Sequence, residues 1–418
     1  MISISTMPDL LRTTRVILVR HGRSTFNQQG RFQGSCDQSL LAEQGRIQAQ
    51  QVATLLRDSP IDAVFSSPLQ RAQATLQEIL AGLQLSDQTM PVYSHEHLRE
   101  IDIPAWEGLP FHQVRSEQAE SYRQWQLRPH EFTMHRSIEP NRSIEALASS
   151  QAGTATAVLT RQPVQTTLFY PVLDLYERAR SFWQQVLPHR LGQTLLIVSH
   201  GGTNHALIST ALGLSAAQHH RLQQSNGGIS LLSFAEACPQ SGQLHCLNTT
   251  AHLDEILPKL KAGKQGLRLI LAPLSSDREQ WQKLRQRFET IQIDFSLSKA
   301  HPLDDPSISS SQSCSADAML DILLSPHPHT VRLETTRHDF PRVWQQTIDA
   351  QTQRITEPTS LLTGLVLASE TEIRQILAQA IGLNPLEDWR LPIDRSRFSL
   401  LHYPGTNHPP VVQGFNLE

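Results

Sequence analysis

The chain has 418 residues, which suits two domains of roughly 150 to 250 residues each. Its 39% hydrophobic content excludes a disordered chain, and its formal charge of −3 without a Lys/Arg-rich run argues against a nucleic-acid or anionic-membrane partner. The four cysteines form no CxxC pair, so we expect neither a disulfide framework nor a zinc site. No apolar stretch approaches the roughly 18 residues of a spanning helix, and we expect a cytoplasmic protein.

Two apolar runs that end in His-Gly are the main features of the first half. After a leader, 1–14, the run 16–19 predicts a buried strand that stops at Arg20-His21-Gly22. The run 195–198 stops in the same way at Ser199-His200-Gly201. Because the carboxyl ends of parallel strands meet at one edge of a sheet, the two histidines are expected to share one site. The Arg20 cation beside the backbone amide of Gly22 would favour binding of an anion at this site.

The other elements of the first half alternate between strand and helix, as in an α/β fold. Arg71 falls in the first turn of one predicted helix, where free amides favour a phosphate. Within the irregular stretch 91–171, the Ala-, Ser-, Thr- and Gln-rich segment 136–167 predicts an inserted flexible loop. We expect helices at 40–57, 70–80, 170–187 and 203–212, strands at 62–65 and 229–234, and a polar linker at 239–265.

The second half resembles the first. The segment from Thr194 aligns without a gap to the segment from Thr363, at a constant offset of 169 residues. Pro273 and Leu274 stand where the first copy has Arg20 and His21, and Ser369 stands where it has His200. We therefore expect a catalytic domain at 15–238 and a shortened, degenerate, non-catalytic copy at 266–418.

Four motifs together resemble the histidine phosphatase superfamily, also called phosphoglycerate-mutase-like. They are RHG at 20–22, SSPLQRA at 66–72, LREIDIPAWEG at 98–108 and VSHGG at 198–202. The resemblance implies a three-layer α/β/α sheet followed by the degenerate copy. It also implies a phosphoric monoester hydrolase of the histidine acid phosphatase type, which needs no metal or other cofactor.

The resemblance also implies roles for individual residues. His21 would attack phosphorus, while Arg20, Arg71 and His200 hold the transferred oxygens. Glu100 is the candidate proton donor, and Glu107 is its principal competitor. The candidate substrate-binding residues are Arg23, Asn27, Gln33 and Gly201.

Within the superfamily, the chain is most similar to the branch of 2-carboxy-D-arabinitol 1-phosphatases, which also carry a degenerate second domain. The implied substrate is a small phosphorylated sugar acid or related metabolite, with 2-carboxy-D-arabinitol 1-phosphate as one candidate. A cofactor-dependent phosphoglycerate mutase remains an alternative, as does a non-catalytic metabolite-binding or regulatory protein. We expect a small phosphorylated metabolite as partner, neither nucleic acid nor membrane, and leave a homodimer open.

Overall fold

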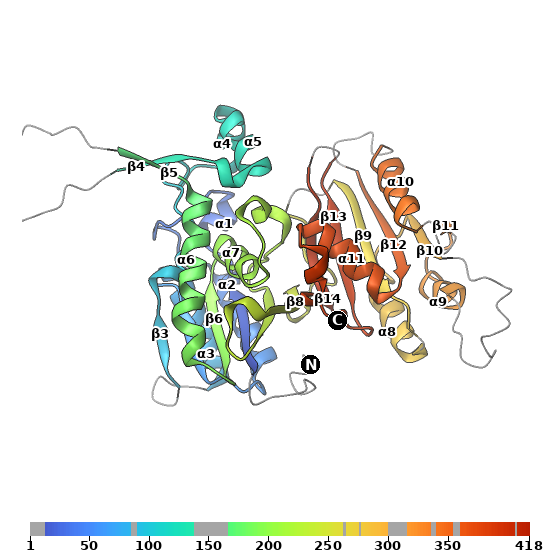
Figure 1. Cartoon of the computed structure of the whole chain (residues 1–418), viewed down its shortest axis with the longest axis horizontal. Coiled ribbons are helices and arrows are strands. Elements are labelled where there is room, and N and C mark those ends of the chain that lie inside the picture. Colours follow the sequence, from blue (N-terminus) through green and yellow to red (C-terminus); the bar gives the residue numbers. More distant parts are fainter. Residues whose placement is uncertain are drawn as a thin grey trace, which may run out of the picture.

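A computed structural model describes residues 13–84, 90–137, 166–261, 265–275, 277–299, 316–335, 340–353, 360–405 and 408–418. In these residues, twelve strands form one sheet that runs through both halves of the chain, in the order β11-β10-β12-β9-β13-β14-β8-β7-β1-β6-β2-β3 (Figure 1). No helix in the described part of the chain combines the length and the hydropathy that crossing a membrane requires.

The first half builds one side of this sheet. Its strands β3, β2, β6 and β1 are parallel, whereas β7 and β8 are antiparallel to their neighbours. The strands are β1 (Thr13–Arg20), β2 (Ala63–Ser66), β3 (Val92–Ser94), β6 (Thr194–Ser199), β7 (Ile229–Ala235) and β8 (Gly242–Thr249).

Helices cover both faces of this part of the sheet, because the apolar run of β1 is buried on both sides. Val16 and Leu18 share a core with the helices α6 (Pro171–Val186) and α7 (Gly201–Ala211). Ile17 and Val19 pack with α2 (Glu43–Leu56) and α3 (Gln70–Leu83) on the opposite face. The predicted three-layer α/β/α fold is therefore confirmed.

A separate group of short elements completes the first half beyond the carboxyl ends of the strands. It consists of α1 (Thr25–Gln29), α4 (Phe111–Glu117), α5 (Ala119–Leu127) and the antiparallel pair β4 (Met134–Ser137) and β5 (Thr166–Phe169). The predicted loop 136–167 lies outside the described residues between 138 and 165. Its two ends belong to the β4–β5 pair.

The second half repeats this architecture. Reading outward from the middle of the sheet, β14-β13-β9-β12-β10-β11 corresponds to β8-β7-β1-β6-β2-β3, with the same parallel and antiparallel pairs. Its elements are β9 (Gly266–Pro273), α8 (Arg278–Phe288), β10 (Phe295–Lys299), α9 (Ala316–Leu323), β11 (Val331–Thr335), α10 (Phe340–Gln353), β12 (Leu361–Ala368), α11 (Glu370–Ile381), β13 (Phe398–Tyr403) and β14 (Val411–Leu417).

Strand registers establish the duplication residue by residue. Arg15 pairs with Thr194 in the first half, and the aligned residues Arg268 and Thr363 pair in the second. The β7–β8 and β13–β14 pairs also carry irregularities at equivalent positions. The second half is thus a shortened copy of the same fold.

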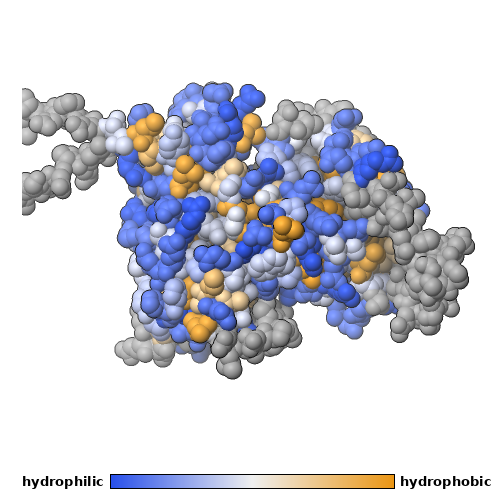
Figure 2. Space-filling view, viewed as in Figure 1, coloured by the Kyte–Doolittle hydropathy of each residue, from blue (hydrophilic) through white to orange (hydrophobic). Residues whose placement is uncertain are grey.

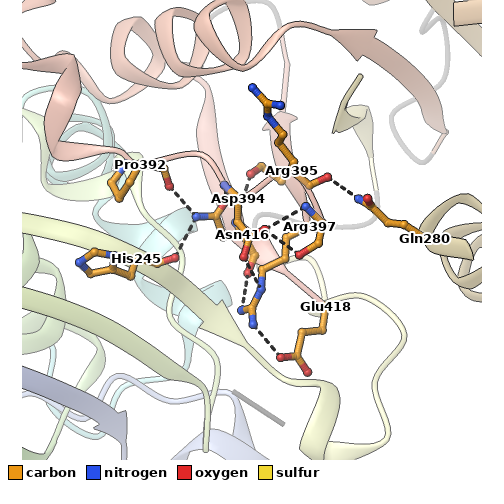
Figure 3. A network of polar contacts seen from close by, with 10 residues as sticks. His245, Gln280, Pro392, Asp394, Arg395, Arg397, Asn416 and Glu418 are labelled. Carbon is orange, nitrogen blue, oxygen red and sulfur yellow. Dashed lines mark hydrogen bonds and ion pairs between the residues drawn. The ribbon is translucent and has the colours of Figure 1, made fainter. Parts of the chain in front are cut away.

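The two copies meet edge to edge through β8 and β14, in a nearly symmetric contact. The Nδ2 atom of Asn248 donates a hydrogen bond of 2.8 Å to the carbonyl of Gln413, and that of Asn416 donates one of 2.9 Å to the carbonyl of His245. Figure 3 shows the second of these bonds within the network around Asn416, Asp394 and Arg397. Such exchange of equivalent contacts is the geometry of a two-fold interface.

Two boundaries differ from the sequence-based expectations. The predicted linker 239–265 contains the strand β8, which neighbours β7 and β14, so the chain continues the sheet where a polar tether was expected. Thr13 and Thr14, expected in the leader, are the first residues of β1 because they pair with Ala235 and Phe234. Residues 1–12 lie outside the described part of the chain.

The surface agrees with this layered packing. On the face in Figure 2, hydrophilic residues cover most of both halves, and apolar residues appear in small separate groups. The large apolar side chains of the sheet are instead buried beneath the helices.

Candidate active site

The structure brings the two predicted histidines together at the carboxyl edge of the sheet. β1 and β6 are adjacent and parallel, with Arg20 paired to Ser199, so His21 and His200 follow at the same level. Their ring centroids lie 5.2 Å apart, with the ring planes at 60°. Both side chains are almost completely buried.

One hydrogen bond determines which nitrogen of His21 is free. Its Nδ1 lies 2.7 Å from the carbonyl oxygen of Gly22, which can only accept, so Nδ1 carries the proton and Nε2 keeps its lone pair. Burial, followed by the charges of Arg20 and Arg71, holds the pKa of His21 well below 6.5. The ring is therefore neutral at pH 7, as a nucleophile must be.

Two buried guanidinium groups flank the histidines. Arg20 donates through Nη1 to the carbonyl of Gln224 at 3.0 Å, and Arg71 donates to the carbonyls of Cys36 at 3.0 Å and Gly34 at 2.9 Å. Burial lowers the pKa of Arg20 to about 10, which leaves it charged at neutral pH. In the described part of the chain, the Nε atoms of both arginines are buried without a partner. Such unsatisfied donors suit an anion.

Gly201 follows His200 and begins α7 against Arg20. A Cβ atom at Gly201 would lie 3.2 Å from the Nε atom of Arg20. The glycine therefore lets the guanidinium group approach the start of the helix closely.

Of the two candidate carboxylates, Glu100 is the one beside the histidines. Its oxygens accept hydrogen bonds of 3.1 Å from the amides of Gly202 and Thr203, in the first turn of α7 directly after His200. Glu107 instead accepts from the Ser35 hydroxyl at 3.3 Å and the Cys36 amide at 3.0 Å, and burial raises its pKa. Glu107 thus supports the loop whose carbonyls bind Arg71.

The three remaining candidates come from the loop after β1. Arg23 and Asn27 line a cavity of about 570 Å³ that also includes Arg20, whereas Gln33 is not among the described lining residues. The amide oxygen of Gln33 accepts from the hydroxyls of Ser24 at 2.7 Å and Ser39 at 3.1 Å. Gln33 therefore stabilises the loop and is not brought to the cavity.

Two residues of the site were not singled out in the sequence. Ser67, inside the SSPLQRA motif, places its Oγ 2.7 Å from Nε2 of His200. Asn226 donates to the carbonyl of His21 at 3.1 Å and to the Asn27 side chain at 3.0 Å. The motif could have indicated Ser67, but nothing local marks Asn226, which reaches the site because β7 pairs with β1.

No group of three or more His, Cys, Asp or Glu side chains suited to a metal ion occurs among the residues that the structure describes. Apart from the Glu100 carboxylate, the described polar side chains around His21 and His200 are cations and hydrogen-bond donors. Their chemistry matches a phosphoryl group, whose negatively charged oxygens need positively charged partners.

Comparison with known proteins supports the same assignment. The family model of the histidine phosphatase superfamily (branch 1) matches residues 16–170 and 161–246, which together exceed half of the chain. The chain is 35% identical over 236 residues to the 2-carboxy-D-arabinitol-1-phosphatase of Triticum aestivum, covering 56% of this chain but 39% of that protein. A relative from Arabidopsis thaliana is 34% identical over 236 residues, covering 56% of this chain and 41% of its own length.

A shorter relative and a solved structure cover a similar part of the chain. Phosphoserine phosphatase 1 of Hydrogenobacter thermophilus is 27% identical over 58% of this chain and 95% of its own. The crystal structure of the alpha-ribazole phosphatase from Shigella flexneri is 25% identical, covering 56% of this chain and 96% of its own at a TM-score of 0.42. With the family model, the four motifs and the paired histidines in agreement, the chain belongs to the histidine phosphatase superfamily.

Proposed function

We propose that this protein is a phosphoric monoester hydrolase that acts through a phosphohistidine on a small phosphorylated sugar acid. The observation that carries the proposal is His21, neutral at pH 7, with its Nε2 lone pair free, between two guanidinium groups and a second histidine. The name of the wheat relative makes 2-carboxy-D-arabinitol 1-phosphate the first substrate to test. The cytoplasmic location expected from the sequence remains a prediction.

The geometry supports a reaction in two steps. In the first, Nε2 of His21 attacks phosphorus, the bond to the ester oxygen breaks, and Glu100 supplies a proton to the departing alkoxide. Arg20, Arg71 and His200 neutralise the oxygens of the transferred group. In the second, Glu100 takes a proton from water as the water attacks phosphorus, releasing phosphate and restoring His21.

We also propose that the second half, 266–418, is non-catalytic. Pro273 and Leu274 cannot replace the cation and the nucleophile of the first copy. At the position of His200, Ser369 instead forms a capping box with Glu372 at the start of α11.

A direct test compares phosphate release from phosphorylated sugar acids, sugars and amino acids. We expect release from a sugar-acid phosphate and a phosphate label on the protein that acid removes. His21→Ala should abolish the label and slow release by roughly a thousandfold or more, because the nucleophile is gone. His189→Ala is the matched control. His189 is exposed and precedes the amino end of β6, whereas His200 follows the carboxyl end of that strand.

Two other results would overturn the proposal. Isomerised phosphoglycerate without free phosphate would identify a mutase. Substrate binding with neither turnover nor a label would identify a non-catalytic binding protein.

A further inference from the structure

A second cavity, of about 430 Å³, lies where the two halves meet and adjoins the cavity that Arg20, Arg23 and Asn27 line. The first half contributes His205 and His220 to its lining, and the second half contributes His402 and Val411. Four residues line both cavities: Arg115, Tyr122, Trp125 and Lys261. Three of them belong to α4 and α5, whereas Lys261 comes from the segment that joins the two halves.

Both halves hold this segment in place beside the cavities. The side-chain amide of Gln223, which is buried, donates to the carbonyl of Lys259 at 3.0 Å and accepts from the amide of Lys261 at 3.3 Å. From β14, Gln413 donates to the carbonyl of Pro258. Lys261 is therefore positioned by its backbone and is not the end of a free tether.

The shared wall carries two cations. In the described part of the chain, no carboxylate forms an ion pair with Arg115 or Lys261, and Arg115 donates through Nε to the Tyr122 hydroxyl at 3.2 Å. Glu255, the one carboxylate among the described residues that line the cavity containing Arg20, is paired with Lys259 at 2.9 Å. The two cations are thus available to an anion in the cavities.

Lys261 also lies within electrostatic reach of the reacting centre. Lys261 is exposed to solvent and lines the same cavity as Arg20. The Lys261 charge in turn contributes to the lowered pKa of His21. Arg20, which directly precedes His21, lines the same cavity as Arg115 and Lys261, so a substrate whose phosphate is bound by Arg20 would have the rest of the molecule near this wall.

We propose that Arg115 and Lys261 form a subsite for a carboxylate of the substrate, so that the segment between the two halves completes the catalytic pocket. This inference rests on the proposed function. It gives the second half a role that needs no catalytic residues of its own, since Gln413 of β14 binds the joining segment at Pro258 and residues of β13 and β14 line the adjoining cavity.

The test uses two ligands that differ at one group: 3-phosphoglycerate, which has a carboxylate, and glycerol 3-phosphate, which has a hydroxymethyl group there. Their binding to full-length His21→Ala is measured by calorimetry, so that no turnover is needed. Adding Lys261→Ala should reduce the preference for 3-phosphoglycerate roughly tenfold, because a charge-assisted contact is lost. Lys261→Arg should retain most of the preference.

The matched control is Lys283→Ala, which removes an exposed lysine of α8 that is paired with Glu279 at 2.8 Å. It should leave the preference unchanged. Equal binding of the two ligands before Lys261 is replaced, or a preference that Lys261→Ala leaves intact, would overturn the subsite. The proposed function fails separately if the wild-type chain releases no phosphate from any ester while the binding preference is present.

Discussion

At the residue scale, a single carbonyl group sets the tautomer of His21, the proposed nucleophile. The bond from Nδ1 of His21 to the Gly22 oxygen determines the tautomer, and burial, together with the charges of Arg20 and Arg71, lowers the pKa of the ring and keeps it unprotonated. Gly22 is required here for steric reasons, because a Cβ atom at this position would collide with the backbone of Gly45 in α2. The close packing of the loop on α2 and the chemistry of His21 are therefore linked through one small residue.

Replacing Glu100 should reveal its role through the choice of leaving group. Glu100→Gln keeps the shape of the side chain but removes the acid, so kcat for a sugar-acid phosphate should fall about a hundredfold or more. The first-turnover burst of p-nitrophenolate from p-nitrophenyl phosphate should fall much less, since p-nitrophenolate leaves without a proton. Single-turnover labelling of the protein by each ester measures the difference, because the later hydrolysis of the phosphohistidine needs Glu100 as base with either ester.

Glu107→Gln is the matched control for this experiment. Glu107 binds the loop 34–36 and should show no dependence on the leaving group. If Glu107→Gln showed the leaving-group dependence and Glu100→Gln did not, the two carboxylates would have to exchange roles.

At the element scale, the two copies satisfy the same helix start in different ways. In the first copy, Glu100 reaches α7 from a distant segment and accepts from Gly202 and Thr203. The second copy uses the local capping box of Ser369 and Glu372 at α11. The helix start has thus kept its hydrogen bonds while losing the long-range carboxylate.

The β8–β14 junction should depend on Asn416. This buried side chain donates to the carbonyls of His245 and Pro392 and accepts from the amide of Asp394, all within 3.1 Å (Figure 3). Asn416→Ala leaves these groups unsatisfied, so we expect the free energy of unfolding to fall by about 2 to 4 kcal/mol. Urea denaturation measures the change.

Asn384→Ala provides the comparison, because Asn384 is exposed and makes one capping bond of 3.0 Å to the amide of Leu386. Its cost should be clearly smaller, about 1 kcal/mol. Equal losses in the two variants would show that the junction does not depend on the Asn416 network.

At the scale of the whole molecule, one continuous sheet joins two copies of the same fold. The first copy carries the cluster of Arg20, His21, Arg71 and His200, and the second copy has other residues at the positions aligned with Arg20, His21 and His200. The junction buries polar as well as apolar groups, including Arg390, which donates to the Gly242 carbonyl at 3.0 Å. Its aligned partner Arg221 donates to the carbonyl of Ala380 at 3.3 Å. Because equivalent residues hold both sides, the halves are expected to unfold together.

Stability should fall in mild acid because several histidines are buried in their neutral form. Burial lowers the pKa of His220, His245 and His402 to about 4 in each case. Below pH 6.5 the unfolded chain binds protons that the folded chain does not, so this stability is present above pH 6.5 and is lost as the pH falls toward 4. For His402 the loss is about 2 kcal/mol between pH 6.5 and 5.

Urea midpoints at pH 7.5 and 5 test this prediction. His402→Gln keeps a donor for the Gln265 carbonyl but cannot titrate, so its midpoint should depend less on pH than that of the wild type. An unchanged pH dependence would rule out a contribution from His402.

Local sequence patterns were sufficient to predict most of the fold and the pairing of the two histidines at the centre of the site. The apolar runs before His21 and His200 predicted two buried strands, and their common ending predicted that the rings would meet, because strand ends in a parallel sheet share an edge. The ungapped offset between the copies likewise predicted the second fold, which the strand registers confirm. The assigned roles of the site residues remain predictions.

Contacts between distant segments were decided by the tertiary structure. The segment that forms β8 was predicted to be a polar linker. It forms a strand because it pairs with the strands 229–235 and 411–417, and such pairing leaves little signal in the sequence of the segment itself. Asn226 and Lys261 line the cavity containing Arg20 because β7 and Gln223 set their backbone positions. Gln33 supports the loop instead because its side chain bonds Ser24 and Ser39. Periodicity and composition determine which elements form, but the packing of those elements decides which side chains surround a substrate.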